Sequence, residues 1–477
     1  MDNLKLKENG TSFSKEILSG ITVFLTMSYI LFVNPLIGSA AGAPVAGVFV
    51  ATALTSAICT VFMALFSRTP FAMAPGMGLN TFLAYTVCGH HGFHWKEAMA
   101  VAFLAGVGHV LIMATGLRKS LINAMPSYLK MAAGVGLGLF IAYIGLKNAG
   151  LLAYTTQAGQ YEILASGAVV GSSATVPGIN QAITGHQLIA VLGLVIMLIL
   201  MALEKKTGDT YAALTVGIIA ATFIGIPLKV TELSGLRLID PDMILEIKQV
   251  ALSFFGRPGL LSLLDDGPKL LTAISLVLIL LLTNVMDSIG TILGIGRING
   301  SELFDRRDME MFEARGCTSK LDRALVANSL GGAVSALLGT SPATTYIESV
   351  TGIVTGGRTG LTGLVASLMF VLCLPFGNFF HIVPAAAVAP ALVIAGGFMI
   401  SLAVRIDWLN FEESFPAFMT ILFIPLTYGV VYGIAAGVLT HVVIQVALGR
   451  KQAVHPLLYL IAAIFIAMTG AAAWTDF

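Results

Sequence analysis

Charged residues are scarce in this sequence. Asp, Glu, Lys and Arg make up 11% of its 477 residues, whereas a soluble domain usually carries about 25%. Hydrophobic residues make up 57%, and a water-soluble core cannot enclose that much apolar surface. The composition therefore excludes an ordinary soluble domain and indicates a lipid bilayer as the surroundings.

An excess of basic charge is also missing. The net charge is +1 and no stripe of Lys and Arg is present, so a nucleic-acid partner is excluded, because such proteins concentrate positive charge against phosphate. The four cysteines lie far apart and show no C-x-x-C spacing, and no Ser-His-Asp or H-E-x-x-H set occurs. The sequence therefore predicts no metal and no cofactor, and it disfavours an enzyme.

Long apolar runs are what the sequence has in abundance. They recur from Ile17 to Trp474, and at about 20 residues each can cross a hydrocarbon layer of about 30 Å. They lack the alternation that a membrane barrel needs. We therefore predict an all-α polytopic membrane protein with spans near residues 17–38, 44–66, 71–88, 96–116, 130–147, 187–203, 209–227, 271–295, 323–338, 343–356, 361–376, 382–403, 415–428 and 431–448. A last run, 457–474, is either a further crossing or a helix in the interface.

The distribution of Lys and Arg predicts the topology. Each cluster, such as Lys205 with Lys206, lies before the first span or after an even-numbered one, while segment 148–186 lacks both residues. Positive charge favours the cytoplasmic side. We expect a multi-pass protein of the cell membrane with a cytoplasmic N-terminus and an uncleaved first span.

Fourteen crossings divide into two sets of seven. We predict a first repeat over residues 1–230, an extracytoplasmic linker over 231–270, a second repeat over 271–448, and a tail over 449–477 with one further apolar helix. The third span opens with AMAPGMGLN and the tenth with GTSPATTYIES, each around a central proline, Pro75 or Pro342. Paired broken spans are typical of inverted-repeat transporters with a site at mid-membrane. The alternative is that the prolines only kink packed helices.

Two acidic residues within the spans are the strongest site candidates. Asp287 lies in the eighth span and Glu348 in the tenth. An ionised group costs several kcal/mol at the bilayer centre, so such residues face a cavity or a partner. Two carboxylates in one cavity of low dielectric constant cannot both ionise comfortably, which favours proton coupling. The competing interpretation is a structural pair between helices.

Two amides add to this set. Asn80 and Asn284 can donate and accept hydrogen bonds at once, although either could instead bridge helices, as polar residues in membranes often do. Asn284 lies three residues before Asp287, so we expect both on one helix face.

Four motifs together resemble a known family. They are TMSYILFVNP (residues 26–35), APGMGLNTF (74–82), NVMDSIGT (284–291) and TSPATTYIESVTGIVTGGRTGLT (340–362). The set is similar to the AzgA-like branch of the nucleobase–ascorbate transporter family, which contains permeases for adenine, guanine and hypoxanthine. This resemblance implies a fourteen-helix inverted repeat in which a core of spans 1–4 and 8–11 moves against a gate of spans 5–7 and 12–14.

The same resemblance assigns roles to single residues. It implies that Asp287, Glu348 and Asn80 match the substrate-site positions of the eighth, tenth and third spans. Hypoxanthine and guanine members commonly carry Asp where this chain has Asn284, and an amide suits the adenine edge. We therefore expect a purine nucleobase permease that prefers adenine and is coupled to protons. A uracil, xanthine or anion transporter and a membrane-embedded enzyme are the alternatives. Coupling to sodium and a homodimer are left open.

Overall fold

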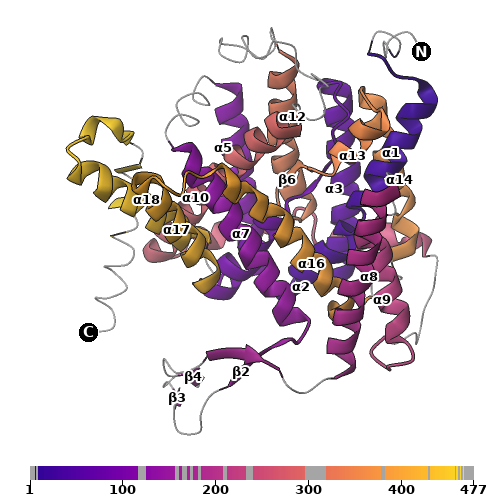
Figure 1. The fold of residues 1–477 in the computed structure, drawn as a ribbon, viewed down its shortest axis with the longest axis horizontal. Coiled ribbons are helices and arrows are strands. Elements are labelled where there is room, and N and C mark those ends of the chain that lie inside the picture. The colour runs from indigo at the N-terminus through magenta and orange to yellow at the C-terminus, as the bar shows by residue number, and fades with distance from the viewer. Residues whose placement is uncertain are drawn as a thin grey trace.

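The chain folds into a bundle of membrane-length helices (Figure 1). The structure is a computed structural model that describes all residues except 1–5, 7–8, 116–124, 156–160, 164–168, 172–175, 181–183, 208–211, 232–239, 296–318, 378–381, 428–429, 457, 460–461, 464–465 and 467–477. Among the described residues, seven helices are long and apolar enough to cross a bilayer, and three shorter apolar helices accompany them. Most of the last apolar run, 457–474, lies outside the described residues.

The first half of the chain supplies seven predicted spans. The first span is interrupted near Tyr29 and the third consists of a strand, a short α-helix and a π-helix. Two small antiparallel sheets of two strands each occupy the predicted outside loop. One pairs β2 (Leu152–Thr155) with β5 (Val176–Ile179), and the other pairs β3 (Tyr161–Ile163) with β4 (Val169–Gly171). The other elements are α1 (Phe13–Met27), α2 (Ile30–Ala40), α3 (Val45–Phe66), β1 (Met73–Pro75), α4 (Met77–Thr81), η2 (Phe82–His90), α5 (Trp95–Ala114), α7 (Ser127–Asn148), α8 (Gly185–Thr207) and α9 (Ala213–Gly225).

The second half repeats this plan, with a strand and a short helix in its tenth span. The linker before it forms three 3-10 helices, which the sequence analysis did not predict. The elements are η3 (Pro241–Gln249), η4 (Ser253–Phe255), η5 (Leu261–Leu264), α10 (Gly267–Ile295), α12 (Lys320–Leu338), β6 (Ala343–Thr345), α13 (Ser349–Thr355), α14 (Gly360–Leu372), η7 (Leu374–Phe376), α16 (Ala385–Ile400), η8 (Ser401–Arg405), α17 (Phe411–Leu426), α18 (Val430–Ala447) and η9 (Lys451–Ala453). The predicted all-helical inverted repeat with broken third and tenth spans is therefore confirmed.

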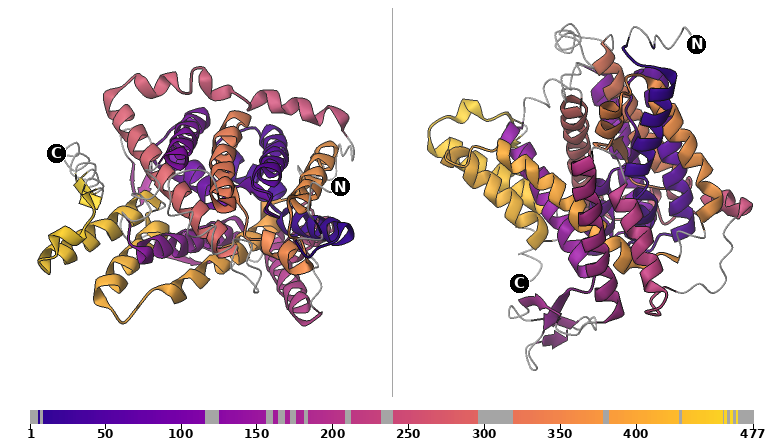
Figure 2. Two further views of the ribbon diagram at one scale, coloured as in Figure 1. Left: turned by 90° about the horizontal axis from the view of Figure 1, so that it is seen from above. Right: turned by 45° about the vertical axis from the view of Figure 1, so that its right-hand side comes forward.

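The helices pack as two bodies. In the core, α12 lies against α3 and α5, and α14 lies against α1 and α3. In the gate, α7 packs on α16 and α17, while α8 packs on α9. Seen from above, the linker helices run along one edge of the core, away from α17 and α18 (Figure 2). Residues of the two halves thus interleave within each body.

A buried carboxylate fixes the start of α14 inside the core. Glu16 of α1 is fully buried, and its oxygens accept the backbone N–H groups of Arg358 (2.8 Å), Thr359 (3.1 Å) and Thr362 (3.1 Å). The Thr362 hydroxyl donates to the same carboxylate at 2.6 Å. Thr362 lies in the first turn of α14, whose N–H groups have no partner within the helix, and Arg358 and Thr359 directly precede that turn. Glu16 is therefore a structural acid that joins the first span to the eleventh.

Candidate substrate site

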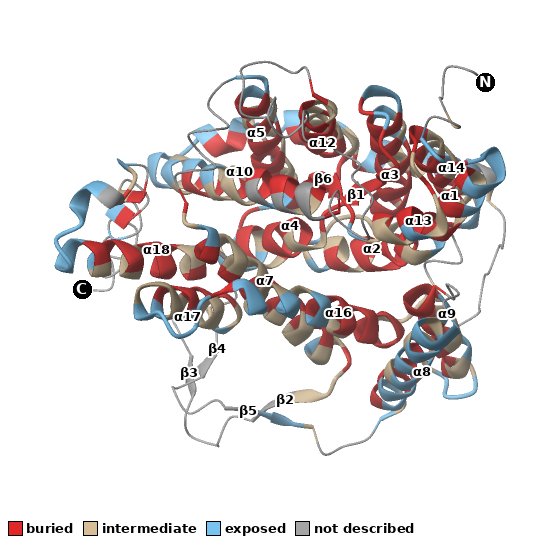
Figure 3. Cartoon of the chain, turned by 45° about the horizontal axis from the view of Figure 1, so that its top comes forward, coloured by how far each residue is buried: buried red, intermediate tan, exposed pale blue. Residues whose placement is uncertain are grey.

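The two broken spans meet inside the core, where α2, α3, α4 and α12 surround them (Figure 3). β1 and β6 pair as antiparallel strands with Met73 opposite Thr345. Beyond the strands, the Gly76 N–H donates to the Pro342 carbonyl at 3.0 Å. Pro75 has no N–H to continue a helix, which explains why the third span starts as a strand. The matching interruptions in the sequence are thus one joint structure built by both halves.

Asp287 projects from α10 beside this strand pair. The hydroxyls of Thr344 in β6 and Thr291 in α10 lie in hydrogen-bonding contact with its carboxylate. Asp287 is nevertheless an exposed residue. Because a carboxylate offers about four acceptor positions, it can accept further hydrogen bonds from a ligand.

Glu348 follows β6 in the tenth span, which is the second of the two broken spans. The Tyr29 hydroxyl donates to its Oε1 at 2.7 Å, and the carboxyl group is half-buried. Tyr346 lies within electrostatic range of both Glu348 and Asp287. Its own hydroxyl donates to the Pro75 carbonyl at 2.6 Å. The structure thus brings the two predicted carboxylates into one neighbourhood at the strand pair.

Asn80 belongs to a different cluster of buried polar groups. Its amide nitrogen donates to Asn34 Oδ1. The Asn34 amide in turn donates to the hydroxyls of Thr52 (2.5 Å) and Thr340 (2.8 Å). All four side chains are buried. This cluster locks α2, α3 and α4 to the turn before β6 and leaves the Asn80 carbonyl oxygen with its orientation fixed.

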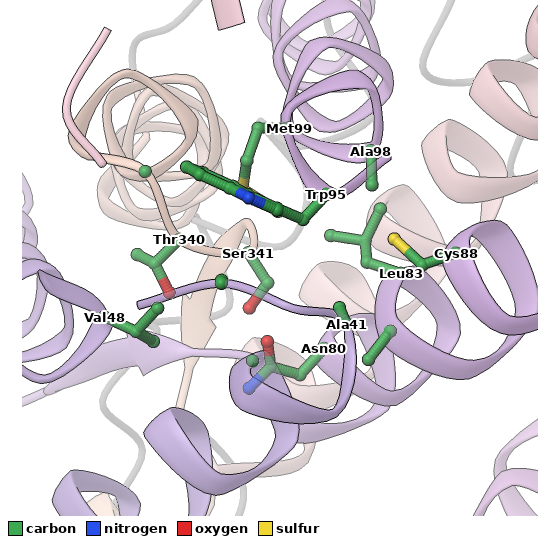
Figure 4. Close-up of a pocket in the computed structure, with 14 residues that line it drawn as sticks. Ala41, Val48, Asn80, Leu83, Cys88, Trp95, Ala98, Met99, Thr340 and Ser341 are labelled. Atoms are coloured by element: carbon green, nitrogen blue, oxygen red, sulfur yellow. The ribbon is translucent and has the colours of Figure 1, made fainter. Parts of the chain in front are cut away.

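A small cavity lies at that oxygen. Figure 4 shows the Asn80 side chain below Ser341 and Thr340, with the Trp95 ring on the opposite wall. The cavity has a volume of about 30 Å³, which is room for about two water molecules. Ligand pockets for small molecules usually measure about 300 Å³ or more. The cavity therefore fits water rather than a nucleobase.

Asn284 has different surroundings from Asp287. It is 0% exposed, and neither atom of its amide has a hydrogen-bond partner among the described residues. Its amide nitrogen packs against α12, where a Cβ built on Gly332 would lie 3.2 Å from it. Asn284 therefore faces α12, whereas Asp287 is exposed. The expected shared helix face thus does not give both side chains the same surroundings in this conformation.

Asn328 of α12 was not singled out from the sequence. Its amide nitrogen donates to Ser288 Oγ at 2.5 Å, and its carbonyl oxygen accepts the Thr345 N–H (2.7 Å) and hydroxyl (2.9 Å). One buried amide thus ties β6 to α10 one residue from Asp287. An Asn within an apolar span is a candidate functional residue. A search of every span for such residues would have identified Asn328 and Asn34.

Comparisons with known proteins agree with this architecture. Residues 14–436 match the sequence profile described as Permease family. The chain is 33% identical to the adenine permease AdeQ of Escherichia coli K12, covering 97% of this chain and 94% of that protein. It is also 33% identical to the guanine/hypoxanthine permease PbuO of Bacillus subtilis 168, covering 96% and 98%. The transmembrane domain of the cyanobacterial bicarbonate transporter BicA superposes with a TM-score of 0.59 at 16% identity, covering 89% and 97%, and so shares the fold.

Proposed function

This chain belongs to the permease family, and on that premise we propose that it carries a purine nucleobase across the cell membrane together with protons. Two similar proteins, AdeQ and PbuO, are named as permeases for adenine and for guanine and hypoxanthine. The motifs that resemble the AzgA-like branch include all four residues proposed for the site. Substrate would bind to the core, which would move as an elevator against the gate, with the N-terminus in the cytoplasm.

The single observation that carries this proposal is the pair of carboxylates at the strand pair. Asp287 of the eighth span is exposed, and Glu348 of the tenth span shares with it the neighbourhood of Tyr346. Carboxylates accept hydrogen bonds from the N–H edges of a purine. They repel an inorganic anion, which disfavours a carrier of bicarbonate or sulfate on the same fold. A proton bound between them would neutralise one charge during the crossing.

Uptake of labelled purine tests the transport itself. We expect cells that make the protein to accumulate adenine, guanine or hypoxanthine against a gradient, and a protonophore to abolish the accumulation. Unlabelled adenine, guanine and hypoxanthine should compete, whereas uracil, xanthine and bicarbonate should not. Accumulation that survives the protonophore but requires sodium would replace the proton by sodium. Competition by uracil or bicarbonate alone would contradict the purine assignment.

Asp287→Ala should eliminate binding. A purine that leaves water must replace its hydrogen bonds or lose about 1–3 kcal/mol per unpaired group, which corresponds to about 5- to 150-fold in affinity. The measurement is calorimetric or scintillation binding to purified protein. Asp242→Asn, at an exposed acid of the linker, is the matched control. Wild-type affinity in Asp287→Ala would show that this carboxylate does not bind the base.

Glu348→Gln should abolish concentrative uptake while the protein still folds, because it preserves shape and removes the group that titrates. The measurement compares the accumulated purine inside and outside liposomes under an imposed proton gradient. Exchange of purine at equal concentrations should persist, since that reaction requires no net proton movement. Undiminished accumulation in this variant would exclude Glu348 as the coupling site.

A further inference from the structure

The break in the first span lies directly against Glu348. α1 ends at Met27 and α2 begins at Ile30, so Tyr29 occupies the junction between them. Its side chain is 1% exposed, and its hydroxyl donates to Glu348 Oε1 at 2.7 Å. A buried hydroxyl needs a partner, and here the partner is the carboxylate assigned to proton coupling.

The contact belongs to a fixed helix interface rather than to a single chance approach. One turn along both helices, the hydroxyls of Thr26 and Thr351 lie 3.2 Å apart. Gly352 lets the helices approach closely, because a Cβ there would lie 2.4 Å from Val23 Cγ2. These contacts set the register of α13 on α1, and that register places Tyr29 at Glu348.

Without the Tyr29 hydrogen bond, the half-buried side chain of Glu348 would be poorly oriented. Its side chain has three rotatable bonds, and ordering it costs conformational entropy. Hydrogen bonds from fixed donors offset that cost and select one orientation. We propose that Tyr29 is a positioning residue, which holds the Glu348 carboxyl group in the orientation that couples proton and purine movement. This inference rests on the proposed function.

The chain supplies a matched control in Tyr346. This residue is also buried, at 6% exposure, and lies two positions before Glu348. Its hydroxyl donates to a backbone carbonyl, that of Pro75, at 2.6 Å. Replacing either tyrosine by phenylalanine removes one buried hydroxyl and preserves the ring. Only the substitution at Tyr29 removes a donor to the Glu348 side chain.

The test is a double-mutant cycle in liposomes with two readouts, purine uptake driven by a proton gradient and purine exchange at equal concentrations. We expect Tyr29→Phe to lower gradient-driven uptake about tenfold, the size of one hydrogen bond to a charged group, and to change exchange by less than about threefold. In the Glu348→Gln background, where only exchange remains to be measured, Tyr29→Phe should leave exchange at the rate of Glu348→Gln alone, because a residue that acts through Glu348 has nothing left to position. Tyr346→Phe should lower both readouts equally in the wild type and should lower exchange further in the Glu348→Gln background.

The outcomes separate the two proposals. If Glu348→Gln retains gradient-driven uptake, proton coupling at Glu348 fails and the role of Tyr29 fails with it. If Glu348→Gln abolishes uptake but Tyr29→Phe lowers exchange further in the Glu348→Gln background, only the positioning role is overturned. Equal loss of both readouts in Tyr29→Phe, including complete loss through misfolding, also overturns the positioning role.

Discussion

The core and helix α16 of the gate bury different kinds of side chain. In the core, Glu16, Asn34, Asp322 and Asn328 are all 0% exposed, and each has hydrogen-bond partners on a neighbouring segment or in its own helix cap. In the gate, the buried residues of α16 are all Ala, Val, Pro, Leu, Ile or Gly. Membrane helices associate through both hydrogen bonds and close packing of small residues. Here the core uses hydrogen bonds, whereas α16 relies on close packing.

This division fits their proposed tasks. Hydrogen bonds are directional, so the core networks hold the strand pair and its carboxylates in one geometry. Apolar contacts are not directional, and a surface made of them can shift without leaving a polar group unpaired. Side-chain hydrogen bonds between core and gate include Ser28 with Thr215 (2.9 Å) and His90 with Tyr432 (3.0 Å). A moving core would have to exchange these two bonds.

A single substitution can disrupt the close packing of α7 against α16 in the gate. Gly138 and Gly396 bring the backbones of α7 and α16 into contact, since a Cβ on Gly396 would lie 2.3 Å from the Gly138 carbonyl oxygen. We expect Gly396→Val to destabilise the protein by about 3 kcal/mol or more, because backbone cannot give way as a side chain tip does. Thermal unfolding in detergent is the measurement.

Gly397→Val is the matched control for that prediction. A Cβ at Gly397 meets no atom within 4 Å, so the same substitution one residue further along should leave the unfolding temperature nearly unchanged. Equal destabilisation by the two variants would mean that loss of glycine, and not the close approach of α7 and α16, determines the effect.

The core should fail in a different way, through unpaired polar groups. Asn328→Leu leaves the Thr345 N–H without its acceptor at the strand pair. An unsatisfied buried group costs about 1–3 kcal/mol, so we expect a loss of about 2 kcal/mol together with loss of purine binding. Ser329→Ala is the control, since the Ser329 hydroxyl donates only within its own helix, to the Val326 carbonyl. If Asn328→Leu unfolds at a lower temperature but binds purine normally, β6 does not depend on this amide.

The sequence predicted the spans and their two interruptions because both are local properties. Apolar length defines a span, and Pro75 and Pro342 mark the breaks. It did not predict the partners of the site residues, because these lie far apart along the chain: Tyr29 and Glu348 are 319 positions apart, and Asn34 and Thr340 are 306 apart. The residue pattern within one span carries no information about such long-range contacts. Tyr29 and Asn34 lie within the motif TMSYILFVNP, but the sequence assigned neither of them a role.

Asn284 gives the smallest expected effect and the finest test of how the core binds its substrate. Its amide is fully buried against Gly332 and has no partner among the described residues, so a purine would meet it only in a conformation that opens this contact. An amide can donate to N1 of adenine and accept from its amino group, whereas an ionised Asp only accepts and suits the N1–H of hypoxanthine.

We therefore expect Asn284→Asp to change the ratio of competition by the two purines about fivefold in favour of hypoxanthine, since a site with an unpaired polar group rejects the mismatched base. The measurement is inhibition of labelled guanine uptake by adenine and by hypoxanthine in the same preparation. A ratio is insensitive to how much of the variant folds, so any cost of burying the new carboxylate does not obscure the result. An unchanged ratio would assign Asn284 to the packing of α10 on α12 and leave the choice of purine to Asp287 and Asn80.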